Sequence, residues 1–427
     1  MISGLRRFNL FRAISLTWVF IPFQWEYLDR FGYNGQQILL LNAVFTLAAV
    51  LSEIPTGVLA DTIGRKKALS LGGLTMVVSC VTFLTGGWAH SYFYFVVANV
   101  FAALSMTLVS GSDSAYLYDL MADRGATPRY PRVEMTSTAF KLLGNATGGV
   151  VGFFIARHSI EWTFGFTAIL AFVASGVAAT LPEPAMRTRK DLHRHLAESL
   201  QIVRSSRIII AMVLFSMFLF PLLRIGVYLD PIHANLHYIP VAYLGLAFAA
   251  KDLVSAFGSF GVGRLINMVG RGPILLFLAA IAAVAFLIQG IAHGPWCYGL
   301  FLLPALALGL FSPVIKIIIN ENVSNPERRA TVLSVEGMFR RLGYAFFSPI
   351  IGWLVDSLPL GAVFISMAFL GFAAAGIGAL VIVIGNGRMR RPLSAEASGR
   401  SSNPLKIPDA PDKSGRRAEV GLDRFAN

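Results

Sequence analysis

The chain has little charge and little cysteine. Charged residues make up 14% of its 427 residues, whereas a soluble domain carries roughly a quarter. The only cysteines are Cys80 and Cys297, each within an apolar run, which argues against a disulfide framework or a zinc site. The sequence contains no P-loop pattern, no nucleophile–base motif and no basic patch interleaved with aromatic residues. These absences disfavour an enzyme, an ATP-driven machine and a nucleic-acid-binding protein, and no cofactor is expected.

Apolar sequence is in excess: 55% of the residues are hydrophobic. A helix needs about 20 apolar residues to cross a bilayer, and twelve segments meet this requirement. They are 10–29, 37–60, 69–88, 92–120, 135–157, 161–181, 208–230, 240–262, 273–292, 295–319, 333–356 and 360–384. The first is interpreted as a retained span, because it lacks the small-residue cleavage site of a signal peptide. The predicted fold class is an all-α polytopic membrane protein embedded in a lipid bilayer.

Positive charge is unevenly distributed among the connections. If the N-terminus is cytoplasmic, the cytoplasmic segments hold about 27 Lys and Arg residues and the opposite connections hold only Arg30 and Arg157. Such asymmetry marks the cytoplasmic side of a membrane protein. It predicts an even number of spans and both termini in the cytoplasm, as expected for a bacterial inner-membrane protein.

The two longest polar segments divide the chain. Segment 182–207 carries leucines at helical spacing on a charged background, which predicts an amphipathic helix on the membrane surface. Segment 385–427 is rich in Pro, Ser and Gly, which predicts a disordered cytoplasmic tail. The expected organisation is a six-helix bundle over 1–181, the linker over 182–207, a second six-helix bundle over 208–384 and the tail over 385–427.

One short pattern occurs twice. The sequence GVLADTIGR at 57–65 recurs as GRLINMVGR at 263–271, and FKLLG at 140–144 recurs as FRRLG at 339–343. Gly57, Asp61, Gly64 and Arg65 thereby correspond to Gly263, Asn267, Gly270 and Arg271. Each copy of the longer pattern follows the second span of its half. Two six-helix halves related by duplication are therefore predicted.

The loop at 57–67 resembles the signature loop between helices 2 and 3 of the major facilitator superfamily, and the resemblance covers nearly the whole chain. It implies twelve transmembrane helices in two pseudo-symmetric six-helix bundles. It also implies a secondary transporter that moves a small molecule or ion by alternating access and works as a monomer. In that family the loop holds the outward-open state, so the eight repeated residues named above are the expected gating residues.

Physical reasons for these gate residues are also apparent. Gly57 would let two helix ends approach closely, and Gly64 would permit a turn that most residues resist. Asp61 would lie where a helix N-terminus favours an anion. Arg65 would pair with carboxylates of neighbouring helices.

Charged residues within predicted spans are candidates for coupling or substrate binding. They are Glu26, Asp113, Lys141, Arg224, Lys251, Asp252, Glu336, Arg340 and Arg341. Asp113 and Glu26 are favoured as the coupling or substrate carboxylates, and Lys141, Arg224, Arg340 and Arg341 as the cations of the cavity. Arg12, Lys316 and Glu53, in contrast, lie near the ends of their spans and are interpreted as reaching the interface or as pairing with neighbouring helices. Asp113 is interpreted either as a coupling or substrate carboxylate or as the structural partner of Lys141 or another cation.

Some of these residues also carry alternative interpretations. Glu26 lies between Trp25 and Tyr27, which would form either a face for a cation or an aromatic belt at the outer interface. Glu336 and Arg340 are spaced to neutralise each other. Arg341 then remains for Asp252, for another carboxylate or for an anionic substrate, and Arg224, beside Pro221, is a second candidate for binding an anion.

Asp230, His233 and His237 are spaced along one helical face, and their side chains suit iron or another divalent transition metal. Pro231 is expected to break this geometry. The interpretation as interfacial polar residues is favoured, and no metal site is predicted.

Span 5 is similar to the glycine-rich signature of drug–proton antiporters, with Gly144, Gly148, Gly149 and Gly152 spaced for close helix packing. It departs from that signature because Gly149 replaces a Pro and Phe153 a Gly. The antiporters' Arg in span 4 is also missing, since no Arg lies between Tyr92 and Asp119. In size and layout the chain is also similar to iron carriers of magnetosome membranes.

The sequence therefore favours a proton-coupled exporter or antiporter. One alternative is a metal-ion transporter of a magnetosome-type membrane. The alternative of another class is a non-transporting receptor or scaffold with the same fold.

Overall fold

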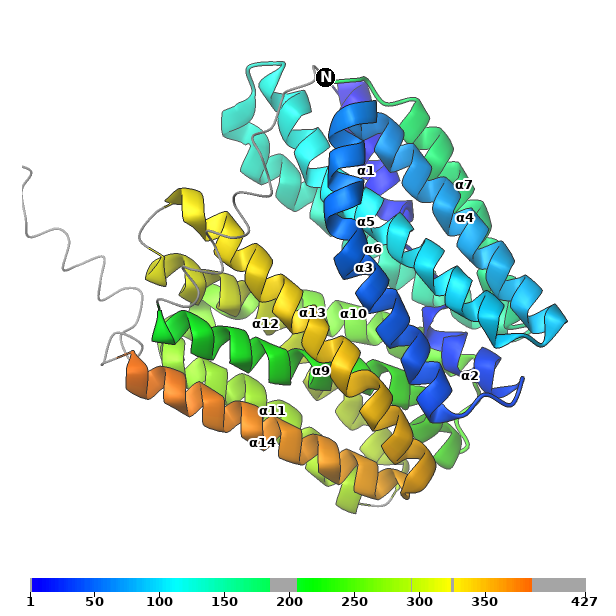
Figure 1. Ribbon diagram of the computed structural model, residues 1–427, viewed down its shortest axis with the longest axis vertical. Coiled ribbons are helices and arrows are strands. Elements are labelled where there is room, and N and C mark those ends of the chain that lie inside the picture. Colours follow the sequence, from blue (N-terminus) through cyan, green and yellow to red (C-terminus); the bar gives the residue numbers. More distant parts are fainter. Residues whose placement is uncertain (1, 185–205, 293, 324–325, 386–427) are drawn as a thin grey trace, which may run out of the picture.

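The computed structural model describes residues 2–184, 206–292, 294–323 and 326–385, and every regular element in these ranges is a helix (Figure 1). The N-terminal bundle comprises α1 (Ile2–Ile14), η1 (Ile21–Phe23), α2 (Gln24–Asp29), α3 (Gly35–Ile63), α4 (Arg65–Ala89), α5 (Tyr92–Ala122), η2 (Thr127–Arg129), α6 (Tyr130–Ala156) and α7 (Glu161–Ala179). The C-terminal bundle comprises α9 (Arg207–Leu236), α10 (Tyr243–Val269), α11 (Arg271–Ile291), η3 (Pro295–Phe301), α12 (Leu302–Asn322), α13 (Pro326–Ser357) and α14 (Leu360–Ile384).

This arrangement confirms the predicted all-α fold with two helical bundles. Among the described residues, nine helices are long and apolar enough to cross a membrane. The other three predicted passes are the interrupted first one, α10 with Lys251 and Asp252, and α13 with Arg340 and Arg341. The amphipathic helix predicted within 182–207 and the tail predicted over 385–427 lie almost wholly outside the described residues.

The first predicted span is not one continuous helix, contrary to the expectation for 10–29. Between α1 and η1 the chain leaves the helical path, and Pro22 has no amide hydrogen to continue it. The break is stabilised locally, because the Val19 amide donates to Thr167 Oγ1 at 3.1 Å and Thr17 Oγ1 donates to the Ala13 carbonyl at 2.7 Å. Irregular backbone at membrane depth is tolerated where it is buried or lines a cavity.

The outer surface of the helices is apolar. Phe172, Phe257 and Phe369 are 64%, 80% and 69% exposed on α7, α10 and α14. A soluble monomer rarely exposes so much apolar surface. These side chains are the surplus hydrophobic residues of the composition, and they are placed to contact lipid.

The predicted repeat has the same geometry in both bundles. Gly64, between α3 and α4, has φ +95°, and Gly270, between α10 and α11, has φ +92°. This region suits glycine and disfavours other residues. The arginine after each turn binds the helix that crosses beside it: Arg65 Nε lies 3.0 Å from Asp119, and an Arg271 Nη atom donates to Glu321 at 3.0 Å. We call the end of the molecule with these two turns the turn end.

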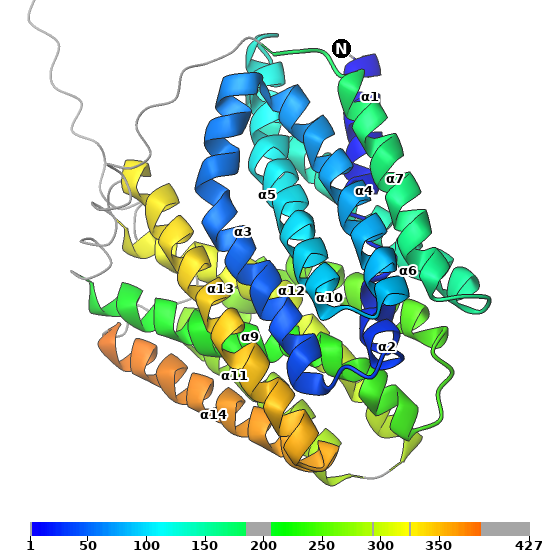
Figure 2. The same ribbon diagram turned by 45° about the vertical axis from the view of Figure 1, so that its right-hand side comes forward.

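The bundles meet along α3 and α13 and along α6 and α10, and the contact is closest at the end opposite the turns (Figures 1 and 2). Here Asp356, in the last turn of α13, accepts hydrogen bonds from the Gly35 and Gln36 amides at 2.7 and 2.8 Å. We call this the cap end, because a carboxylate of one bundle caps the N-terminus of a helix in the other. Both views show α3 and α13 together at the cap end and apart at the turn end.

Two physical expectations for the turn loop are wrong in this structure. No atom of the described residues comes within 4 Å of where a Cβ on Gly57 or on Gly263 would lie, so neither glycine mediates a close approach between described helices. Asp61 lies in the last turn of α3, not at a helix N-terminus. Its carboxylate is 3.6 Å from Arg65 on the same bundle.

Candidate substrate site

A cavity of about 140 Å³ lies between the two bundles. The N-terminal bundle contributes the broken first pass and the glycine face of α6, and the C-terminal bundle contributes α9 and α10. Its lining residues are Leu16, Thr17, Trp18, Val19, Ile21, Pro22, Asn145, Gly148, Gly149, Arg224, Phe248 and Asp252. We call this space the central cavity.

Three polar atoms of residues that line the central cavity have no hydrogen-bond partner among the described residues. They are Trp18 Nε1, Asn145 Oδ1 and Asp252 Oδ2, and all three atoms are buried. Arg224 also forms no hydrogen bond or ion pair within the described part of the chain, although its charge acts on Asp252. Buried polar groups are nearly always paired, so unpaired donors and acceptors around one cavity require a separate explanation.

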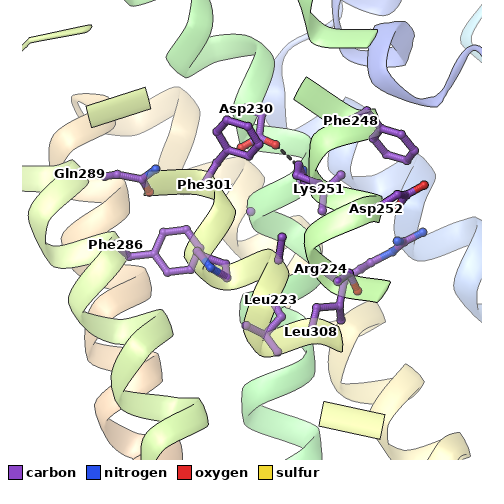
Figure 3. Close-up of a pocket in the computed structure, with 15 residues that line it drawn as sticks. Leu223, Arg224, Asp230, Phe248, Lys251, Asp252, Phe286, Gln289, Phe301 and Leu308 are labelled. Carbon is purple, nitrogen blue, oxygen red and sulfur yellow. Dashed lines mark hydrogen bonds and ion pairs between the residues drawn. The ribbon is translucent and has the colours of Figure 1, made fainter. Parts of the chain in front are cut away.

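A smaller cavity of about 40 Å³ continues into the C-terminal bundle and shares Arg224, Phe248 and Asp252 with the central cavity. In its wall, Lys251 Nζ donates to Asp230 (Figure 3). Figure 3 shows Lys251 directed toward Asp230, whereas Arg224 and Asp252 point together toward the N-terminal bundle. Lys251 is therefore paired with its neighbour, whereas Asp252 has no ion pair within 4 Å among the described residues.

The expectation that Pro231 breaks the helix is wrong, because α9 continues through Pro221 and Pro231 to Leu236. His233 Nε2 and His237 Nε2 lie 3.2 Å apart on the last turns of α9. Asp230 on the same helix is taken by Lys251. No group of three or more metal-ligating side chains occurs in the described residues.

Asp113 belongs to a different cluster, inside the N-terminal bundle. Arg12 Nε lies 3.3 Å from Asp113 Oδ2, and Arg12 Nη2 lies 2.6 Å from Glu134 Oε1. Ser114 Oγ donates to the same Glu134 oxygen at 2.9 Å, and Lys141 is close enough for its charge to act on Asp113. Arg12 is 4% exposed, so of its two interpretations the structure supports pairing with neighbouring helices and not a position at the interface. Asp113 therefore pairs with Arg12. This agrees with the interpretation of Asp113 as the structural partner of a cation.

Other predicted residues lie apart from the central cavity. At the cap end, Glu26 Oε2 accepts from Asn235 at 3.2 Å, and the burial of Trp25 and Tyr27 excludes an interfacial aromatic belt. On α13, Arg340 Nε is 3.3 Å from Glu336, and its guanidinium lies 4.5 Å from the centre of the Phe220 ring. Arg341 crosses to the N-terminal bundle and pairs with Glu53.

The glycines of α6 pack closely, as their spacing predicts. Gly144 lies against the Ala13 carbonyl of α1, Gly148 against Thr17, and Gly152 against Phe23. Gly149 faces the other bundle, and a Cβ there would lie 2.6 Å from the Gly245 carbonyl of α10. This backbone-to-backbone contact closes the central cavity on the cap side.

The sequence predicted part of this site. It included Arg224, Asp252 and the α6 glycines among its candidates, but it favoured Asp113 and Glu26 as the coupling or substrate carboxylates. It missed Trp18, Asn145 and Phe248. Trp18 could have been recognised from Pro22, because a proline inside an apolar run marks a break that exposes backbone and side chains to a cavity. Asn145 and Phe248 carry no local signal that distinguishes them from packing residues.

Comparison with known proteins places the chain among transporters. A sequence profile of the Major Facilitator Superfamily matches residues 8–320 and 225–412. An uncharacterized MFS-type transporter of Bacillus subtilis, YxaM, is 23% identical over 219 residues, which cover 49% of this chain and 53% of YxaM. The quinolone resistance protein NorA of Staphylococcus aureus is 26% identical over 171 residues, which cover 39% of this chain and 42% of NorA. These matches therefore span about half the length of the relatives or less.

Solved structures of transporters share the fold at low sequence identity. A point mutant of the nucleoside transporter NupG superimposes with a TM-score of 0.76 at 12% identity, covering 89% of this chain and 99% of NupG. A D-xylose–proton symporter gives 0.71 at 16% identity, covering 88% and 96%. A bacterial homologue of the lysosomal transporter Spinster, in an inward-facing conformation, gives 0.68 at 14% identity, covering 92% and 97%. With the repeated turns, the two helical bundles and the cavity between them, these matches show that the chain belongs to the Major Facilitator Superfamily.

Proposed function

We propose that the protein is a secondary transporter that binds a small polar solute in the central cavity and moves it by alternating access. The observation that carries this proposal is the set of unpaired buried atoms: Trp18 Nε1, Asn145 Oδ1 and Asp252 Oδ2. They come from both bundles, so a solute bound to them would contact the two parts that move against each other. Unpaired atoms at such a place are expected where a ligand completes the hydrogen bonding.

Asp252 is the residue that we propose for proton coupling. It has no ion pair within the described residues, and a carboxylate inside a membrane protein is a default candidate for a proton relay. A proton and a cationic group of the solute would compete for this carboxylate, so that one would enter as the other leaves. Competition of this kind gives antiport without any further coupling device.

Export is the proposed direction, from the cytoplasm across the bacterial inner membrane. The Lys- and Arg-rich connections favour a cytoplasmic position for the turn end, and the hydrogen bonds of Asp356 hold the two bundles together at the opposite end. The similarity to NorA, named for quinolone resistance, also favours export.

The test uses the full-length protein in proteoliposomes that contain a pH-sensitive dye. Lipophilic cations, organic anions and small amino carboxylates are added in turn, with Asp252→Asn as the variant and Asp113→Asn as the matched intramembrane control. We expect a solute-dependent pH change that is lost in Asp252→Asn and retained in Asp113→Asn. Loss in Asp113→Asn alone would move proton coupling to the Arg12 cluster, and no transport of any solute would favour a non-transporting receptor.

A further inference from the structure

The charges of the central cavity come as an unpaired couple of opposite sign. Arg224 on α9 and Asp252 on α10 both line it, and neither has an ion pair within 4 Å among the described residues. Elsewhere inside the bundles the opposite arrangement prevails, as in Arg12 with Asp113 and Lys251 with Asp230. The couple at the cavity is thus exposed to whatever occupies the space.

A solute with a single charge fits this couple poorly. A cation at Asp252 would lie beside the like charge of Arg224, and an anion at Arg224 would lie beside Asp252. In either case one charged group of the protein would stay buried without a partner, which is costly in a low-dielectric interior. A solute that carries both charges would satisfy both residues at once.

Size and wall chemistry narrow the solute further. A water needs roughly 10–15 Å³ of cavity by this measure, so the central cavity of about 140 Å³ has room for about ten waters. A solute of roughly ten non-hydrogen atoms would fit. Trp18 and Phe248 supply apolar walls, and the Trp18 Nε1 and Asn145 Oδ1 atoms supply a further donor and acceptor.

From this geometry we propose that the solute is a small zwitterion, with a carboxylate that binds Arg224 and a protonated amine that binds Asp252. A planar guanidinium holds a carboxylate through two parallel hydrogen bonds, and an ammonium would donate to the Asp252 carboxylate. The inference rests on the proposed transport function, because it names the solute of that same cavity. It also explains the role of the neighbouring Lys251–Asp230 pair, which removes a third charge from the cavity wall.

The experiment measures binding to the purified full-length protein by calorimetry. Leucine, phenylalanine and 4-aminobutyrate serve as zwitterionic probes with two different spacings between the charges. Phenethylamine and 3-phenylpropanoate are the matched probes, since each is phenylalanine without one of its two charged groups. At least one zwitterion should bind, and phenylalanine should bind at least about tenfold more tightly than either singly charged probe.

Two variants test which residue binds each charged group of the solute. Arg224→Gln should weaken phenylalanine binding to about the level of phenethylamine binding, and it should not weaken phenethylamine binding, because it removes the like charge beside Asp252. Asp252→Asn should weaken phenylalanine binding to about the level of 3-phenylpropanoate binding, and it should not weaken the binding of that anion. Arg30→Gln, which alters an exposed ion pair with Glu161, is the control and should change nothing.

The outcomes separate this inference from the transport proposal. Equal affinities for the zwitterion and one singly charged probe, or no binding of any zwitterion up to about 10 mM, would overturn the inference. Proton-linked transport of another solute would leave the proposed function standing. Charge-dependent binding of a zwitterion without transport would support the site and contradict the transport proposal.

Discussion

The two ends of the α3–α13 pair are held in different ways. At the cap end, Asp356 accepts from the Gly35 and Gln36 amides, and Ser348 Oγ donates to the Leu39 carbonyl at 2.9 Å. Toward the turn end, the last ion pair between the bundles within the described residues is Glu53–Arg341. Beyond it, within the part of the chain that the structure describes, Asp61 and Arg65 form ion pairs only inside their own bundle. The turn loop is easy to recognise in the sequence, yet its Asp61 and Arg65 form no ion pair with a described residue of the other bundle in this conformation. Asp356, which no sequence motif marks, does bond across the interface.

The largest effect is expected from filling the cap-end contact. Gly149→Leu would push a side chain into the Gly245 carbonyl, where a Cβ alone would lie at 2.6 Å. Overpacking costs about 1–3 kcal/mol, and backbone on both sides leaves little room to relax. We expect transport to be lost while the protein still inserts in the membrane, as measured by uptake and by the amount of purified protein. Gly176→Leu is the control, because nothing lies within 4 Å of that position; equal transport by both variants would contradict the closed contact.

The turn end is tested by Asp61→Asn. We expect this variant to abolish transport and to leave membrane insertion intact, because the side chain is proposed to act in the opposite conformation. Its present contact with Arg65 is a partly exposed pair at 3.6 Å, and such pairs contribute about 0–1 kcal/mol. The melting temperature should therefore stay close to that of the parent. Normal transport by Asp61→Asn would show that the turn end needs no gate at this residue.

A smaller effect is expected from Asp356→Ala, which removes the cap of α3 contributed by the other bundle. Loss of a helix cap costs typically about 1 kcal/mol, or roughly a fivefold shift away from the cap-closed conformation. Hydrogen exchange should therefore be faster at the Gly35 and Gln36 amides. Asn34, which bonds to the Gln37 amide at 2.9 Å, would keep its own part of the cap. Unchanged exchange in Asp356→Ala would mean that the cap-end contact does not depend on this carboxylate.

Sequence reasoning succeeded where the signal is local. The spacing of Gly64 and Gly270 in the repeat predicted two special turns, and both have positive φ. The glycines of 144–152 predicted a close-packed face, and that face forms. The order of the helices followed from apolar runs alone, because a lipid-facing helix must be apolar over most of its length.

Sequence reasoning failed where the hydrogen-bond or ion-pair partner of a side chain is distant in the sequence. Nothing near Asp113 indicates that Arg12 will reach it, and Asp356 lies 321 positions from the Gly35 amide that it caps. For the same reason the sequence could not show that Asp113 is paired while Asp252 has an unpaired oxygen. Both are acids within a span, and only the packing of several helices distinguishes them.

The Gly149–Gly245 contact also has a consequence for the speed of the transport cycle. Because Gly149 and Gly245 bring no side chains of their own to this contact, these two residues add little to the apolar surface that opening exposes, and the hydrophobic cost of opening scales with that area. Such a contact can exclude water through close packing while adding little to the free energy that holds the two bundles together. The two conformations can then remain close in free energy, and binding of one small solute is enough to favour one over the other.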